Sequence, residues 1–277
     1  MTEILNGRVL ANNIREKAAE RIHKLPHPPG LAVILVGDDP ASHLYVGLKE
    51  NAAKEVGIYI EKYELPAETD EQKIIQLIEE LNARQDIHGI LVQLPLPGQN
   101  VDKVIAAIDP KKDVDGFHGE NRRLLLANTP NLVPPIALAI MRMLQASHTP
   151  LTNKKAVIIG NSAIFAEPVI ELMKEASVDA QFLNRHATSI AAKTRAADII
   201  VVAVGEAGFL QRDMVKAGAV VIDVGTNKKD GKVVGDAAPE LVGHAGFLSK
   251  VPGGVGPLTV AYLLFNVIKA MEVQERA

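Results

Sequence analysis

Tyr45 and Lys49 are four residues apart, a spacing that puts both side chains on one face of a helix. They follow an apolar run over 31–36 and the turn residues Gly37-Asp38-Asp39-Pro40, an order typical of a strand, a turn and a helix start. The pair would then lie at the carboxyl end of a strand, where open α/β domains place their chemistry. A solvated surface pair is the alternative interpretation, and the rest of the chain decides between the two.

Further polar side chains are candidates for the same rim. Gln93 lies in the run 89–94, which is followed by Pro95 and reads as another strand end. Asp113 and Asp115 lie in a charged, turn-rich loop, and loop carboxylates are more often solvated than functional. We expect Gln93 and the loop after it to face the same rim as the tyrosine and the lysine.

A second set of residues is suited to a nucleotide. The apolar run 155–159 precedes Gly160-Asn161-Ser162 and then an amphipathic run, a layout that holds phosphate on backbone N–H groups at a helix start. The three-glycine fingerprint is absent, because only Gly160 is present. Arg185 follows the next strand, where an arginine can pair with a 2′-phosphate, so it favours NADP over NAD. A solvated arginine at a strand end is the alternative.

The segment Val251-Pro252-Gly253-Gly254-Val255-Gly256-Pro257-Leu258-Thr259 is too rich in glycine and proline for a regular element. Such a segment suits a backbone close against a flat ligand, or a chain forced through an unusual turn. Asp223, in an apolar strand, is more typical of a hydrogen-bonded structural carboxylate than of an acid or base.

The periodicity predicts two α/β domains. Strands and helices alternate in the first part of the chain, which indicates a parallel sheet with right-handed crossovers. A helix over about 134–146 would bridge into the second part, where five parallel strands are predicted over 155–159, 180–183, 198–204, 219–224 and 247–251. A final apolar helix over 259–271 should pack back on the first domain. The predicted domains are 1–120 plus 259–277, and 121–258 with a Rossmann-type fold, flanking one cleft.

Composition excludes several classes of protein. The chain has 277 residues, 47% of them hydrophobic and 23% charged, so it can build two cores and is neither fibrous nor disordered. The net charge of −3 and the absence of a basic run argue against a nucleic-acid partner. There is no cysteine, which removes disulfides and thiolate chemistry and is compatible with the cytoplasm. We expect no targeting segment and no apolar stretch of about 18 residues that could cross a membrane.

Four blocks of sequence occur in the order and spacing of one family. They are Val36-Gly-Asp-Asp-Pro-Ala-Ser42 with Tyr45 and Lys49, Gly89-Ile-Leu-Val-Gln-Leu-Pro-Leu-Pro97, Lys112-Asp-Val-Asp-Gly-Phe-His118, and Val251-Pro-Gly-Gly-Val-Gly-Pro-Leu-Thr-Val-Ala261. Together they resemble the bifunctional 5,10-methylenetetrahydrofolate dehydrogenase/5,10-methenyltetrahydrofolate cyclohydrolase family across nearly the whole chain.

The resemblance implies an NADP-linked oxidoreductase and hydrolase of one-carbon metabolism, with NAD possible as the cofactor and no metal. It implies that Lys49 is the central catalytic group, with Gln93 as its hydrogen-bond partner. On the substrate side it implies folate contacts from Tyr45, Asp115, Pro252, Gly253 and Gly254, with Asp115 gripping the pterin. On the cofactor side it implies contacts from Gly160, Asn161, Ser162, Arg185, Val204, Gly225, Thr226, Gly254 and Thr259. A cytoplasmic homodimer with a role in purine biosynthesis is implied as well.

Some residues depart from the family pattern. Asn161 replaces a usual arginine, and Arg185 is positioned to restore the lost charge. The family's Pro-Cys-Thr-Pro segment is Leu132-Val133-Pro134-Pro135 here. Two alternatives therefore stay open: a folate-binding protein whose nucleotide site has decayed, and a shikimate-type NADP dehydrogenase, which the Asn184-Arg185 pair resembles.

Overall fold

The computed structural model describes residues 1–275. The chain divides into two compact units. One holds residues 12–135 and 260–275, and the other holds residues 1–11 and 136–259. Below, the first is called the lysine unit and the second the six-stranded unit.

The lysine unit is built on a three-stranded parallel sheet in the order β3 (Tyr59–Leu65), β2 (Gly30–Val36), β4 (Gly89–Val92). All seven residues of the central strand β2 are buried, which explains its unbroken apolar sequence. The predicted parallel sheet is therefore confirmed. Because the middle strand comes first in the chain, the sheet order reverses between β2 and β4, and their carboxyl ends lie side by side.

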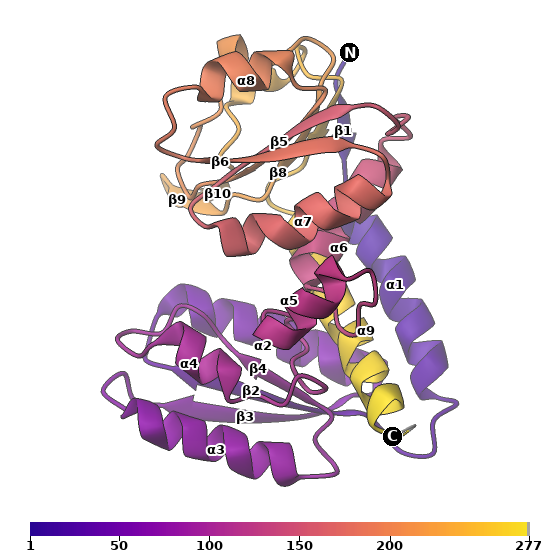
Figure 1. Cartoon of the computed structure of the whole chain (residues 1–277), viewed down its shortest axis with the longest axis vertical. Helices are drawn as coiled ribbons and strands as arrows, with labels where there is room; N and C mark the ends of the chain where they lie inside the picture. The colour runs from indigo at the N-terminus through magenta and orange to yellow at the C-terminus, as the bar shows by residue number, and fades with distance from the viewer. Residues whose placement is uncertain (276–277) are drawn as a thin grey trace. The chain divides into compact units, whose positions relative to one another are not determined.

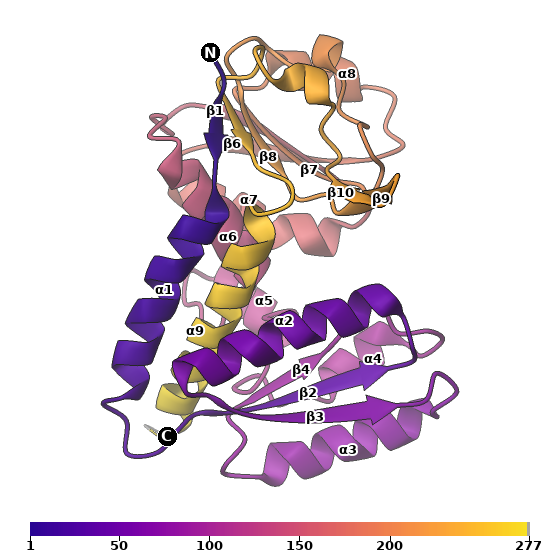
Figure 2. The same ribbon diagram turned by 180° about the vertical axis from the view of Figure 1, so that it is seen from behind.

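Helices α2 (Pro40–Val56) and α3 (Glu71–Ala83) cover opposite faces of this sheet (Figures 1 and 2). Successive side chains of β2 point alternately into two hydrophobic cores. One core joins Leu31, Val33 and Leu35 to α2, and the other joins Ala32, Ile34 and Val36 to α3. The sheet thus presents one side to α2, the helix that carries Tyr45 and Lys49.

Local sequence fixes both ends of α2. The Asp39 carboxylate accepts hydrogen bonds from the Ser42 backbone N–H and the Ser42 hydroxyl, both at 2.8 Å, and Pro40 lies at the first helical position. The helix ends at Gly57, whose φ of 90° is in the left-handed region. The lysine is held on a helix with defined capping at both ends.

Helix α9 (Val255–Glu275) begins four residues before the predicted start at residue 259. The glycines and prolines around residue 257 suggested a loop. Pro257 lies in the first turn of the helix, where no intrahelical N–H is needed, so a helix can contain it. Leu263, Leu264 and Val267 join the core beside α2, so this helix packs within the lysine unit. Contrary to the expectation from sequence, α9 is long and apolar enough to cross a membrane, but 56% of an apolar 18-residue stretch of this helix is buried, as in a core helix.

The remaining helices of the lysine unit are α4 (Val101–Ala106), α5 (Gly119–Leu126) and most of α1 (Gly7–Ile22). Asn266 of α9 donates hydrogen bonds to the carbonyls of Val114 and Val133, at 2.8 and 2.9 Å. These bonds connect the last helix to the loop before α5 and to the segment after it. Residues 121–135 therefore group with the lysine unit, although the predicted boundary fell at residue 120.

The parallel sheet of the six-stranded unit has six strands, one more than predicted. Its sheet contains β5 (Lys155–Gly160), β6 (Asp179–Asn184), β7 (Ile199–Ala203), β8 (Val220–Asp223), β11 (Phe247–Ser249) and β1 (Glu3–Leu5), in the order β6-β5-β7-β8-β11-β1. The added strand β1 pairs with β11 in parallel. A run of three residues is too short to show a strand period, so the amino-terminal segment was assigned to the other domain.

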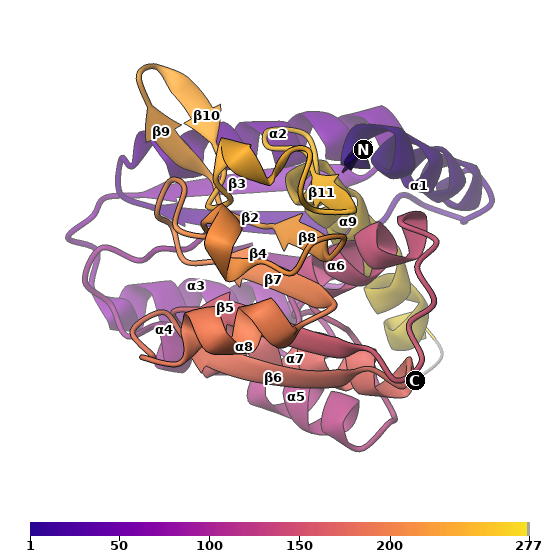
Figure 3. The same ribbon diagram turned by 90° about the horizontal axis from the view of Figure 1, so that it is seen from above.

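If β5, β6, β7, β8 and β11 are numbered 1 to 5 in chain order, they lie in the sheet in the order 2-1-3-4-5. This is one of the common orders of doubly wound nucleotide-binding folds. Helices α7 (Ala163–Glu175) and α8 (Ile190–Ala196) lie on opposite faces (Figure 1). Helix α6 (Pro135–Ala146) leads into the unit, close to the predicted bridging helix. Two short 3-10 helices, η1 (Arg212–Met214) and η2 (Pro239–Leu241), complete it with the hairpin β9 (Asn227–Lys229) and β10 (Lys232–Val234), which extends away from the sheet (Figure 3).

Candidate active site

Lys49 and Gln93 are in direct contact. The Lys49 Nζ donates to Gln93 Oε1 at 2.8 Å, from α2 to the residue that follows β4. The Gln93 backbone N–H continues the ladder to Ile34 at 2.8 Å, and its side-chain Nε2 donates to the Leu94 carbonyl at 2.6 Å. Because the amide nitrogen is held by that carbonyl, the amide oxygen is turned toward the lysine. The predicted pair therefore meets at the carboxyl ends of β2 and β4, where the sheet order reverses.

Burial shifts the proton equilibrium of Lys49 toward its neutral form. Burial lowers the pKa of Lys49, and the Asp115 carboxylate opposes this shift without cancelling it. Burial likewise raises the pKa of Asp115, against the charge of Lys49 and with the repulsion of Asp113. Both side chains retain some exposed surface, so the ammonium is desolvated while a ligand can still reach it. The amine can therefore exchange a proton at a lower pH than a surface lysine.

The loop that carries Asp115 is fixed by its neighbour. The Asp113 carboxylate accepts hydrogen bonds from the backbone N–H groups of Gly116 and His118 and from the Asn121 amide, at 3.0, 2.8 and 3.0 Å. Gly116 has a φ of 73°, and a Cβ there would lie 2.7 Å from the Pro134 nitrogen. Asp113 is thus the structural carboxylate of the pair, and Asp115 is left to face the lysine.

The start of this loop is tied to α3. The ammonium of Lys112, a buried residue, donates to the carbonyls of Leu81, Asn82 and Arg84, at 3.1, 2.9 and 2.6 Å, and so satisfies the open carboxyl end of the helix. Its backbone carbonyl accepts from Ile90 of β4 at 2.8 Å. Sequence reasoning missed this role, because only the fold brings residue 112 to the end of α3.

Helix α2 also carries an aromatic side chain and exposed apolar side chains. Tyr45, half-buried, is one turn before Lys49 on α2. Leu44 and Leu48 of the same helix are 62% and 49% exposed, which is unusual for leucine. This stretch can contact an aromatic or apolar ligand, and the two leucines were not recognised from sequence, because exposure is a property of the fold.

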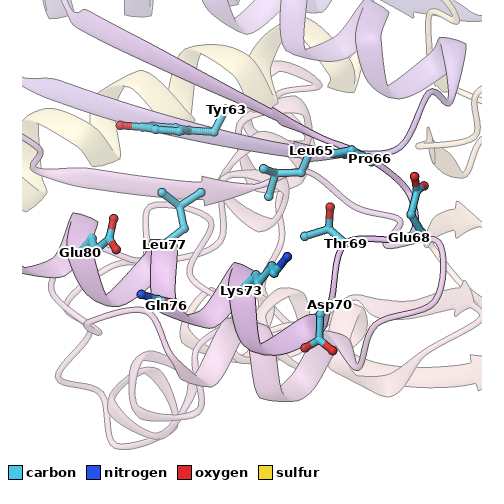
Figure 4. A pocket seen from close by; sticks show the side chains of 10 residues that line it. All are labelled: Tyr63, Leu65, Pro66, Glu68, Thr69, Asp70, Lys73, Gln76, Leu77 and Glu80. Carbon is cyan, nitrogen blue, oxygen red and sulfur yellow. The ribbon is translucent and has the colours of Figure 1, made fainter.

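A separate groove lies between β3 and α3 (Figure 4). Its lining side chains mix acidic, basic and apolar types, including Tyr63, Asp70, Lys73 and Glu80. Helix α3 covers the opposite face of the sheet from α2, so this groove does not belong to the lysine site. None of the residues predicted to act in catalysis lines it.

In the six-stranded unit, the turn after β5 has the geometry expected for a nucleotide. Gly160 ends β5, and residues 161–164 are exposed at the start of α7. Ser162 caps the helix by accepting from the Ile164 N–H at 3.1 Å, and Asn161 donates to the Val204 carbonyl at 3.1 Å. The turn lies where the order of β6, β5 and β7 reverses. The donors at this helix start are of the kind that hold a phosphate.

Arg185 lies beside this turn but already has partners. Its Nη1 donates to the Val204 carbonyl at 2.8 Å, its Nη2 forms an ion pair with the Glu206 carboxylate, and its guanidinium carbon is 5.8 Å from the centre of the Phe209 ring. Its backbone N–H also bonds the Gly160 carbonyl at 3.0 Å. The arginine is therefore near the expected cofactor turn, with a carboxylate that sequence analysis did not anticipate.

The loop with Val204 is held by a buried aspartate. The Asp236 carboxylate accepts from three successive backbone N–H groups, those of Val204, Gly205 and Glu206, at 2.6, 3.0 and 2.9 Å. Gly225 lies against the same carboxylate, since a Cβ there would be 2.3 Å from it. Asp236 was missed in the sequence because its partners are about 30 residues away.

Asp223 is a structural carboxylate, as predicted. It accepts from the backbone N–H groups of Gly225, Asp236 and Ala237, at 2.9, 3.0 and 2.8 Å. Burial raises its pKa to about 6 against the effect of these bonds. Thr226, next in the chain to Gly225, is exposed.

The glycine-rich segment packs against the start of α1. The Gly253 carbonyl accepts from the N–H groups of Gly7 and Arg8, at 2.9 and 3.2 Å, and Gly253 has a φ of 106°. A Cβ on Gly7 would lie 1.8 Å from the Gly254 oxygen. The unusual turn therefore has a cause within the protein, with Pro252 exposed beside it. Thr259 lies inside α9, and its hydroxyl donates to the Val255 carbonyl at 3.2 Å.

The predicted residues thus fall into two groups, one in each unit. Tyr45, Lys49, Gln93 and Asp115 belong to the lysine unit, and the predicted cofactor residues to the six-stranded unit. Among residues 1–275, no group of three or more His, Cys, Asp or Glu side chains could hold a metal ion.

Comparison with known proteins gives relatives over the whole length. The chain is 42% identical over 276 residues to the bifunctional protein FolD of Geotalea daltonii, covering 98% of this chain and 99% of that protein. It is 46% identical over 275 residues to the bifunctional protein FolD of Burkholderia pseudomallei strain 1106a, covering 97% and 96%.

Comparison with solved structures gives the same family of relatives. The bifunctional FolD of Campylobacter jejuni superposes with a TM-score of 0.94 at 38% identity, covering 99% of this chain and 100% of that one. The Trypanosoma brucei enzyme, solved with NADP and an inhibitor, gives 0.94 at 32%, covering 100% and 99%. The shikimate dehydrogenase of Thermus thermophilus, at 15% identity and a TM-score of 0.53, shares only the fold, which leaves the shikimate alternative without support.

Two family models match the chain in succession. The catalytic domain of tetrahydrofolate dehydrogenase/cyclohydrolase matches residues 5–115, which include the lysine, the glutamine and the carboxylate described above. The NAD(P)-binding domain of the same family matches residues 134–275. The chain therefore belongs to the tetrahydrofolate dehydrogenase/cyclohydrolase family.

Proposed function

We propose that this enzyme oxidises 5,10-methylenetetrahydrofolate to 5,10-methenyltetrahydrofolate with NADP and hydrolyses the product to 10-formyltetrahydrofolate. The observation that carries the proposal is the contact between Lys49 and Gln93 beside the Asp115 carboxylate. The match of residues 5–115 to the catalytic domain of the family supports it. The relatives named as bifunctional FolD support both activities.

Asp115 is proposed to hold the pterin. A carboxylate accepts two parallel hydrogen bonds from the amino-pyrimidinone edge of a pterin, which fixes the ring and its one-carbon bridge. Donors from the ligand also stabilise the ionised form of a carboxylate whose pKa is raised by burial. Tyr45, one turn before Lys49 on α2, offers an aromatic ring on which the remaining part of the folate can lie.

Lys49 is proposed to move the proton in the hydrolysis. Water adds to the methenyl carbon and loses one proton, which gives a neutral hydroxyl adduct. The bond from this carbon to N5 then breaks as the hydroxyl loses its proton and becomes the formyl oxygen. N5 gains one proton, the other is released to solvent, and the formyl group stays on N10. A neutral lysine amine can accept the proton from water and return it to the departing nitrogen. Gln93 holds the amine in place through an uncharged oxygen, so the burial that lowers the pKa of Lys49 stays effective.

The residues of the six-stranded unit fit a nicotinamide dinucleotide. The exposed turn 160–162 at the start of α7 offers backbone N–H groups for the phosphates, and Arg185 offers a guanidinium beside it. Val204, Gly225, Thr226, Gly254 and Thr259 are proposed to line the remaining contacts, with Pro252 and Gly253 on the folate side. The bound dinucleotide supplies the hydride acceptor for the first reaction, so its nicotinamide must reach the one-carbon bridge of the folate.

A spectrophotometric assay tests this function. Purified protein is mixed with methylenetetrahydrofolate and either NADP or NAD, and formation of the reduced cofactor and of methenyltetrahydrofolate is followed separately. Added methenyltetrahydrofolate then reports hydrolysis without any cofactor. Reduction with NADP together with enzymatic hydrolysis is expected. Folate binding with neither reaction would instead favour a binding protein.

We also propose a homodimer in the cytoplasm whose 10-formyl product serves purine synthesis. The edge strand β6 supports the dimer, because it pairs only with β5 among the described residues and leaves its other edge open. The absence of cysteine fits a reducing compartment. Light scattering coupled to gel filtration tests the dimer, with a mass twice the 29.7 kDa of the chain expected.

A further inference from the structure

Glu206 is a charged residue that the proposed function does not use, although it lies at the proposed cofactor turn. It follows β7 and forms an ion pair with Arg185, which follows β6. These two strands flank β5, so the pair bridges the loops on either side of the turn 160–162. Doubly wound folds recognise the adenosine ribose at the end of the second strand, here β6.

The two partners differ in how firmly they are held. The Arg185 side chain is 24% exposed, lies over the Phe209 ring and donates to the Val204 carbonyl. The Glu206 side chain is 56% exposed, and its carboxylate pairs with the arginine. The Glu206 backbone N–H is bonded to the buried Asp236 carboxylate at 2.9 Å. The loop thus keeps the glutamate at this place, while its carboxylate remains accessible.

This arrangement sets two recognition chemistries against each other. An arginine beside the ribose favours a 2′-phosphate, whereas an acidic residue accepts a hydrogen bond from a 2′-hydroxyl and repels a phosphate. Here Nη2 of the arginine is already paired with a carboxylate, so a phosphate must displace Glu206 and then lie close to its negative charge.

We propose that Glu206 is a specificity-determining residue that weakens the preference of this enzyme for a 2′-phosphate and lets a dinucleotide with a free 2′-hydroxyl bind at the same site. The inference rests on the proposed cofactor site and deepens it. Glu206 neutralises the charge of Arg185, and its carboxylate accepts a hydrogen bond from the 2′-hydroxyl of NAD. Binding of NADP requires the arginine to exchange this carboxylate for the phosphate.

Equilibrium binding by titration calorimetry tests the inference without catalysis. The ligands are NADP and NAD, with 2′,5′-ADP and 5′-AMP as fragments that isolate the 2′-phosphate. In Glu206→Gln, binding of NADP and of 2′,5′-ADP should tighten by about tenfold, because one repulsive charge is removed and one guanidinium is released. Binding of NAD should weaken or stay the same. The gain should shrink at high salt, as expected for a partly exposed charge.

Two further variants sharpen the test. Glu240→Gln removes the same charge at an exposed position of η2 in the same unit, and its affinities should stay within about twofold of the parent. Arg185→Gln combined with Glu206→Gln should lose the gain in 2′-phosphate binding. Glu206→Ala repeats the measurement with a second side chain, and circular dichroism confirms that each variant is folded.

The outcomes separate the inference from the proposed function. An unchanged ratio of NADP to NAD affinity in both Glu206 variants overturns the inference and leaves the cofactor site intact. No binding of any dinucleotide or fragment, by parent and variants alike, overturns the cofactor half of the proposed function as well. Binding of 2′,5′-ADP that appears only in the Glu206 variants supports the inference.

Discussion

At the scale of single residues, Lys49 should separate catalysis from folding. In Lys49→Met, hydrolysis of methenyltetrahydrofolate should fall by about 10²–10⁴-fold, because the group that transfers the proton is lost. The free energy of unfolding should stay within about 1 kcal/mol, since the lysine is partly exposed and its ammonium is disfavoured by burial. Hydrolysis is followed by the loss of methenyl absorbance, and stability by urea denaturation.

Lys54→Met is the matched control for this variant. Lys54 lies on the same helix, is 62% exposed and pairs with Glu50 rather than with a residue of the site. Its hydrolysis rate should equal that of the parent protein. Full hydrolysis by Lys49→Met would remove this lysine from the mechanism.

The residue that pairs with Lys49 should set its pKa. Burial lowers the pKa of Lys49, so a larger share of the amine is neutral at a given pH than in a surface lysine. In Gln93→Glu a carboxylate would lie at the 2.8 Å contact and stabilise the ammonium, which raises the pKa. Since the neutral amine is the base, the rising limb of kcat/KM against pH should move to higher pH by about 1 to 2 units.

Gln76→Glu is the control for this variant. Gln76 is exposed on α3, on the other side of the sheet, so its substitution should leave the pH profile of kcat/KM unchanged. A profile of Gln93→Glu that coincides with the parent profile, in a folded protein, would mean that the amide does not control the lysine.

At the scale of elements, the loop with Asp115 depends on the end of α3. Lys112→Met removes the ammonium that donates to three carbonyls there and leaves these acceptors without their partner. The free energy of unfolding should fall by about 2–4 kcal/mol. Urea denaturation measures this loss, with the exposed neighbour Lys111→Met as the control, expected within about 0.5 kcal/mol of the parent. Equal stability of the two variants would show that the capping contacts contribute nothing.

Sequence periodicity predicted those elements that are long and bounded by turn residues. Helix α2 and the buried strands β2 and β4 place Lys49 and Gln93, so their meeting followed from helix spacing and parallel strand ends. The start of α9 was missed because Gly253, Gly254 and Pro257 suggested a loop, whereas the structure places a close backbone contact and a helix start there. Glu206 and Asp236 were missed because their partners come from other loops of the fold.

At the scale of the whole molecule, the first residues of the chain belong with residues near its other end. Strand β1 pairs with β11, more than 240 residues later, and Thr2 accepts from the Gly243 N–H at 2.7 Å and donates to the Ala245 carbonyl at 2.6 Å. The sheet of the six-stranded unit therefore combines residues 3–5 with strands that all lie after residue 154. A boundary drawn from sequence order alone cannot represent this.

The pairing of β1 with β11 can be tested with two adjacent residues of β1. Leu5 is buried, whereas Ile4 is 44% exposed, because successive side chains of a strand point to opposite faces. Leu5→Asp should lower the free energy of unfolding by about 3–5 kcal/mol, since it removes a buried leucine and buries a charge. Ile4→Asp should cost less than about 1 kcal/mol. Hydrogen exchange should then quicken at the backbone amides of β11 in Leu5→Asp alone, and protection equal to that of Ile4→Asp would show that β1 is not part of the folded sheet.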